Sequence, residues 1–180
     1  MSVKEELSRS VEGRLLVKIR RDEIEDGSVS GYVISLGPEF FVLEVVDPGY
    51  GINGFNCLRY RDVTECEVPA PTWRFLERSL ELRGIQRNPS PQVDPSSLPA
   101  LLRTAGASFP VITIHPEEAN PDVCYIGRFA GLEANMLQLL EISPDAEWGD
   151  EEEEHCIDEI TRIDFGCAYE EALVLVASAG

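Results

Sequence analysis

Apolar and polar positions alternate over short stretches in the first half of the chain, which is typical of strands rather than helices. Residues 13–20 (GRLLVKIR) alternate, and residues 28–35 (SVSGYVIS) are rich in β-branched and aromatic side chains. Residues 39–46 (EFFVLEVV) form an apolar run of strand length, and residues 55–61 and 62–68 follow a turn that contains Gly, Pro and Asn. The pattern therefore predicts five short strands in this half.

The second half repeats the pattern. Three pairs of segments match in the same order, at offsets of 95, 96 and 97: 17–23 with 112–118, 31–47 with 127–143, and 61–68 with the segment that begins at Asp158. Matches that keep their order predict an internal duplication, and the one-residue drifts fall between the apolar runs, where turns absorb insertions. Gly31 and Gly127 match one another, and we expect each where a strand bends or a neighbouring strand comes too close for a Cβ.

Each half is expected to end in a short helix. In residues 71–84 the spacing of Trp73, Leu76 and Leu80 is helical and Gly84 is a stop signal, and residues 168–180 show a similar spacing. Residues 85–99 hold four prolines and predict a semi-extended linker.

A short helix is expected after the linker, with Ser96 or Ser97 as its cap and Gly106 as its stop. The predicted organisation is a first unit at 1–84, a linker with a short helix at 85–107, and a second unit at 108–180.

A Gly-containing strand followed by a long apolar strand and a short closing pair resembles the Sm-like, or SH3-type, small β-barrel. The resemblance covers about residues 13–68 and 109–166, and the ending DEITRIDFGCAYEEAL is similar to that of uncharacterised bacterial proteins. The resemblance to Sm-like barrels implies a mainly β fold with short helices, made of two tandem, pseudo-symmetric, five-stranded barrels.

The resemblance does not extend to the residues that contact RNA in Sm-like proteins. Where that family carries an Asp and then an Asn, this chain has Gly37 and Phe41 in the first copy and Glu133 and Leu137 in the second. The Arg-Gly pair of that family has no counterpart in this chain. Large apolar groups cannot replace the hydrogen bonds of an amide, so RNA binding is not expected.

Charge points the same way. The net charge is −18, of which residues 85–180 carry −14, with 4 Lys and Arg against 18 Asp and Glu. Such a surface repels nucleic acids and anionic membranes and favours basic partners or divalent cations. The acidic run at 145–155 is the densest feature. We expect it to be a solvated loop between the third and fourth strands of the second copy, with a basic protein partner or a cation site as alternatives.

Catalytic and metal-binding patterns find little support. His155 and Cys156, with Cys167 further on, suggest zinc, but neighbouring residues of a strand point to opposite faces. No GxSxG motif or glycine-rich phosphate loop occurs, so no catalytic residue, metal ligand or cofactor is predicted. The five cysteines form no CxxC, the N-terminus lacks the apolar core of a signal peptide, and no apolar run is long enough for a membrane span. We therefore expect reduced thiols in a cytoplasmic protein.

The sequence favours a non-catalytic interaction module, a protein-binding adaptor whose acidic face meets a basic protein. The alternatives are a degenerate Sm-like nucleic-acid binder and a carboxylate-based, metal-dependent hydrolase. Candidate partner-binding residues are Asp150, Glu151, Glu152, Glu153, Glu154, Arg59 and Arg61. We expect Arg59 and Arg61 to flank their strand outwardly and to pair with acids, including some of the second half. The chain is expected to be a monomer with a pseudo-two-fold repeat or a homodimer.

Overall fold

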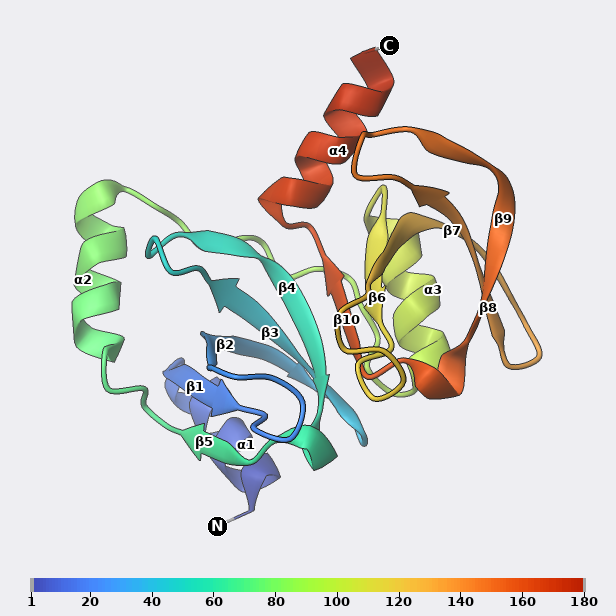
Figure 1. Cartoon of the computed structure of the whole chain (residues 1–180). Coiled ribbons are helices and arrows are strands. Elements are labelled where there is room, and N and C mark those ends of the chain that lie inside the picture. The colour runs from blue at the N-terminus through green and yellow to red at the C-terminus, as the bar shows by residue number, and fades with distance from the viewer. Residues whose placement is uncertain (1, 180) are drawn as a thin grey trace.

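A computed structural model describes residues 2–179. In this part of the chain, ten antiparallel strands form a single sheet with four short α-helices, so the prediction of a mainly β fold is confirmed (Figure 1). The strands are β1 Leu16–Arg20, β2 Val29–Leu36, β3 Phe40–Val46, β4 Ile52–Arg59, β5 Glu65–Glu67, β6 Ile112–His115, β7 Tyr125–Glu133, β8 Met136–Ile142, β9 Trp148–Cys156 and β10 Arg162–Phe165. The helices are α1 Val3–Gly13, α2 Trp73–Arg83, α3 Leu98–Ser108 and α4 Ala168–Ala179.

The strand order is the same in the two halves. The first five strands lie in the order β5-β1-β2-β3-β4, and the last five lie in the order β10-β6-β7-β8-β9. Pairing registers also agree at an offset of 96, since Gly31 lies opposite Val45 and Gly127 lies opposite Glu141. The register of β2 with β3 shifts between Val33 and Ser35, and that of β7 with β8 shifts 96 residues later.

The halves meet where β4 pairs with β10, and the two strands run side by side through the middle of the molecule (Figure 1). The sheet is open, with β5 and β9 at its two edges. The prediction of two closed five-stranded barrels is therefore wrong with respect to closure. Because the outer edge of β4 is already paired with β10, it cannot pair with β5 to close the first half.

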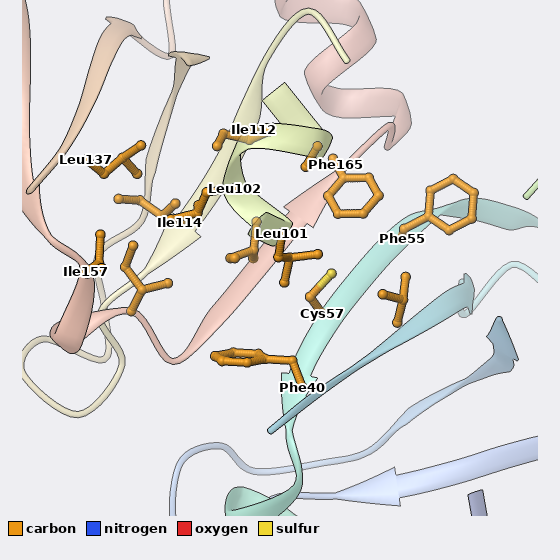
Figure 2. Packing of buried hydrophobic residues seen from close by; sticks show 14 of the residues in the cluster. Phe40, Phe55, Cys57, Leu101, Leu102, Ile112, Ile114, Leu137, Ile157 and Phe165 are labelled. Carbon is orange, nitrogen blue, oxygen red and sulfur yellow. The ribbon is translucent and has the colours of Figure 1, made fainter. Parts of the chain in front are cut away.

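The largest hydrophobic core takes side chains from both halves. Phe40, Phe55 and Cys57 of the first half pack with Leu101 of α3 and Phe165 of β10 (Figure 2). The rings of Phe55 and Phe165 are stacked with centroids 5.6 Å apart. Full burial of a side chain of this size contributes roughly 1.5–3 kcal/mol. The joint between the halves is thus a buried apolar core as well as a strand pair.

The predicted helices are present, with one difference in their ends. Gly84 follows α2 in the left-handed conformation (φ 67°), as expected of a helix stop. The Ser97 hydroxyl accepts a hydrogen bond from the Ala100 N–H and caps α3, but Gly106 lies inside this helix. A Cβ at Gly106 would overlap the Phe129 side chain, so this glycine serves close packing on β7 rather than termination.

Helix α1 was not predicted, although the sequence carries its signal. Ser2 and Glu5 form a reciprocal capping box at its start, and Leu7 is fully buried. The S-x-x-E spacing at residues 2–5 was the available cue. None of the helices described in residues 2–179 has the length and hydropathy to cross a membrane.

The proline-rich linker packs against the first half. The Arg87 Nε donates to the buried Glu44 carboxylate at 2.5 Å, and the Asn88 N–H donates to the same carboxylate at 2.7 Å. Further along, the Pro95 carbonyl lies so close to Gly37 that any Cβ there would overlap it. The linker therefore covers β2 and β3 of the first half.

Candidate interaction surface

The greater part of the acidic run lies in strand β9, which corrects the expectation of a loop over residues 145–155; only residues 145–147 lie in the turn before this strand. From Trp148 to Cys156 this segment is a strand at the outer edge of the second half, paired with β8 on one side (Figure 1). Leu137 and Leu139 of β8 are buried and lie opposite His155 and Glu153. Pairing with the apolar strand β8 thus holds the acidic segment in the sheet, although the composition of that segment does not itself favour a strand.

All five predicted acids, Asp150 and Glu151–Glu154, are exposed in β9. Strand β4 holds the matching place in the first half, and its residues 54–59 are buried. The difference follows from the neighbours, because β10 covers the edge of β4 while β9 ends the sheet. Within residues 2–179, none of the five carboxylates forms an ion pair or a side-chain hydrogen bond.

The carboxylates do not converge on one point. The register with β8 is regular from Glu152 onward, so Glu152 and Glu154 lie on one face of the strand and Glu153 on the other. In the part of the chain that the structure describes, no three His, Cys, Asp or Glu side chains are grouped so as to hold a metal ion. The arrangement provides a row of negative charge along a strand.

A pocket of about 470 Å³ adjoins β9, with Tyr125, Glu141, Glu153, His155 and Glu159 in its lining. The His155 Nε2 lies 2.8 Å from Glu141 Oε1, and the rings of His155 and Tyr125 are 4.4 Å apart. Carboxylates beside an aromatic ring suit a basic side chain. Sequence reasoning missed Tyr125, Glu141 and Glu159, because they come from other segments of the chain.

The structure does not bring together the residues that suggested zinc. His155 is engaged by Glu141. Cys167 lies after β10, where its N–H donates to Glu170 at the start of α4.

Arg59 and Arg61 lie at the joint between the halves. Four strands separate β4 from β9 in the sheet, so the structure does not join these arginines to the acidic strand. The Arg59 side chain is only 3% exposed, which corrects the expectation that it points outward. Its guanidinium donates to Asp62 and to Glu118, each at 2.6 Å. Arg61 is 60% exposed and reaches the same Glu118 at 3.1 Å, so the predicted pairing with an acid of the second half is confirmed.

Two further clusters at the joint were not predicted. Buried Arg21 donates to both carboxylate oxygens of Glu117 at 2.8 Å. Burial alone would raise the pKa of Glu117, but hydrogen bonds from Arg21 and Thr161 outweigh it and lower that pKa. Hydrogen bonding to Arg59 likewise lowers the pKa of Glu118.

The second cluster surrounds Asp164 of β10. This carboxylate accepts from Arg162 at 2.8 Å, from Asn56 of β4, and contacts the His115 Nε2 at 2.9 Å. Burial would raise the pKa of Asp164, yet the charge of Arg162 and the hydrogen bonds lower it. Arginines and acids are thus matched at the joint, whereas the carboxylates of β9 are not.

No protein-family model, curated protein or solved structure matches this chain.

Proposed function

We propose that this protein is a non-catalytic interaction module, an adaptor whose β9 strand binds a basic partner protein. The observation that carries the proposal is the row of exposed carboxylates at 150–154 on an open sheet edge, without counter-charges in residues 2–179. A row of like charges attracts a basic surface over a distance and speeds its association, although each exposed ion pair adds only about 0–1 kcal/mol.

We further propose that the halves are two Sm-like units that arose by duplication. The shared strand order, the registers at an offset of 96 and the equivalent register shifts support this. Where RNA-binding Sm-like proteins carry an Asp, Gly37 packs against the linker carbonyl of Pro95. Where they carry an Asn, Phe41 is fully buried. These features favour a protein partner over RNA.

A cytoplasmic location belongs to the same proposal. All five cysteines are free, and burial raises the pKa of the Cys57 thiol, which keeps it protonated. Unpaired thiols suit a reducing compartment.

The test is binding of fluorescent polylysine followed by anisotropy at about 0.05 M and about 0.5 M salt. One variant neutralises Asp150 and Glu151–Glu154 to Asn or Gln, which changes the net charge from −18 to −13 because five carboxylates are removed. The matched control neutralises five exposed acids elsewhere, at Glu12, Glu39, Glu77, Asp122 and Glu171, and has the same net charge.

We expect salt-sensitive binding that the β9 variant loses and the control variant largely keeps. Equal loss in the two variants would mean that net charge alone attracts the probe, and the proposal would be wrong. Tighter binding of single-stranded RNA than of polylysine would also contradict it.

A further inference from the structure

Strand β9 offers backbone hydrogen-bonding groups as well as charge. It is the last strand of the sheet, with β8 on one side and no strand on the other within residues 2–179. In an antiparallel ladder every second residue directs its N–H and C=O away from the existing neighbour, so the outer side of β9 presents free donors and acceptors. We propose that β9 receives an extended, Lys- or Arg-rich segment of the partner as an additional antiparallel strand. This inference rests on the proposed function and specifies how the basic partner binds.

The chain contains a template for such pairing. Strand β10 adds to the equivalent strand β4 antiparallel, with Arg162 opposite Leu58 and Asp164 opposite Asn56. Asn56 of β4 and Glu153 of β9 hold equivalent places in the two halves. Asn56 lies opposite Leu43 of β3, and Glu153 lies opposite Leu139 of β8, which is the residue that matches Leu43. An added strand in the same register would therefore run along Glu152–His155.

A second copy of this chain is the obvious competitor, because its β5 is the other open edge. By the offset of 97, β5 residues Glu65 and Glu67 correspond to Arg162 and Asp164 of β10. In the template register Glu67 would then lie directly opposite Glu153. Like charges that face one another across strands are destabilising, whereas a Lys or Arg at that place is favourable. The charge pattern thus selects a basic segment over self-association.

The pocket beside β9 supports the same occupant. Tyr125, Glu141 and Glu159 line it together with Glu153, so the pocket is acidic and has one aromatic wall. Glu141 and the Tyr125 ring already contact His155, so a basic side chain from an added strand would meet the carboxylates of Glu153 and Glu159 there. Backbone pairing would give the segment its register, and the pocket would favour Lys or Arg at one position.

The experiment uses a fluorescent peptide of about eight residues in which Lys and Val alternate. The comparison peptide has the same sequence with methyl groups on the backbone nitrogens of alternate residues. Methylation keeps every charge but removes the donors that strand pairing needs. Both registers of methylation are made, because only one blocks the edge that faces β9. We expect the parent peptide to bind. The peptide methylated in one of the two registers should bind about tenfold more weakly, because it loses two or three backbone hydrogen bonds.

Two proline variants of the protein provide an independent test. Glu152 and Glu153 are neighbours, so one N–H faces β8 and the other faces the open edge. Glu152→Pro and Glu153→Pro are both made, and the variant that keeps the wild-type melting temperature is the one that alters only the edge. That variant should lose peptide binding, while a matching Glu→Gln substitution at the same position should keep most of it.

Equal binding of the parent and both methylated peptides would overturn strand addition and leave the proposed acidic interaction standing. So would unchanged binding by the stable proline variant. Failure of polylysine to bind would instead contradict the proposed function itself. Analytical ultracentrifugation measures whether the protein alone self-associates at the concentrations of the assay. Self-association would contradict a basic segment as the occupant of the edge and indicate a second copy of the chain instead.

Discussion

At the scale of single residues, burial decides the role of each arginine. Sequence reasoning anticipated that Arg59 and Arg61 pair with acids of the second half, because that half carries most of the negative charge. It could not show that Arg59 is buried and Arg61 is exposed. Both guanidinium groups reach Glu118, so the difference lies in the surroundings that the folded chain gives to each arginine.

Arg59→Met should destabilise the protein by about 3 kcal/mol, because it removes both hydrogen bonds that the nearly buried Asp62 carboxylate accepts and leaves only Arg61, at 3.7 Å, beside it. Arg61→Met is the control and should cost less than about 1 kcal/mol, as expected for an exposed pair. Urea unfolding measures both values. Similar small losses in the two variants would show that Arg59 is solvated.

The matched glycines permit a second test at this scale. A Cβ at Gly31 would overlap the Glu44 carbonyl oxygen, and one at Gly127 would lie 2.7 Å from the Leu140 carbonyl oxygen. Gly31→Ala and Gly127→Ala should each cost about 1–3 kcal/mol by overpacking. Gly149→Ala is the control, because its Cβ would meet no atom closer than 3.5 Å. Thermal unfolding that ranks Gly149→Ala as the most damaging would refute this interpretation.

At the scale of elements, the helices and most strands could be predicted, and the acidic strand could not. Strands β1, β2 and β3 carry their own apolar pattern, as do helices α2 and α3. Strand β9 does not, since Asp150–Glu154 give neither alternation nor high strand propensity. Its conformation depends on pairing with β8, and periodicity within one segment contains no information about such a neighbour.

The start of α4 supplies a prediction of pH dependence. The Glu170 carboxylate accepts from the Cys167 N–H and from Thr113, and burial raises its pKa above the usual 4.5. A raised pKa in the folded state stabilises the protein fully below pH 4.5, and this stabilisation is lost as the pH rises through the folded-state pKa. Glu170→Gln removes the ionisation and keeps an oxygen acceptor. Its stability relative to wild type, measured by urea unfolding, should therefore increase from pH 4.5 toward neutral pH. A difference that does not change with pH would contradict the raised pKa.

At the scale of the whole molecule, the repeated pattern was visible in the sequence, and the way in which the halves join was not. Hydrophobic periodicity tells which face of a strand is buried but not which strand lies beside it. The pairing of β4 with β10 and the shared core around Phe55 and Phe165 arise from contacts between segments about a hundred residues apart. These contacts make one sheet from two units that the sequence predicts as separate barrels.

A shared sheet and core should unfold as one cooperative unit. The two tryptophans allow a direct check, since Trp73 begins α2 in the first half and Trp148 begins β9 in the second. Trp148→Phe leaves a fluorescent reporter in the first half, and Trp73→Phe leaves one in the second. Each variant should give a urea transition that coincides with its own circular-dichroism transition, and the two m-values should agree. Two separate transitions would mean that the halves fold independently.

Binding of a partner along β9 requires that the acidic run is an open edge strand, and amide hydrogen exchange of β9 in the protein alone tests this most directly. The N–H groups of residues 152–156 should alternate along the strand, slow where they bond to β8 and fast where they face solvent. Uniformly fast exchange would show that this run is a solvated loop, and uniformly slow exchange would show that its outer edge is already covered.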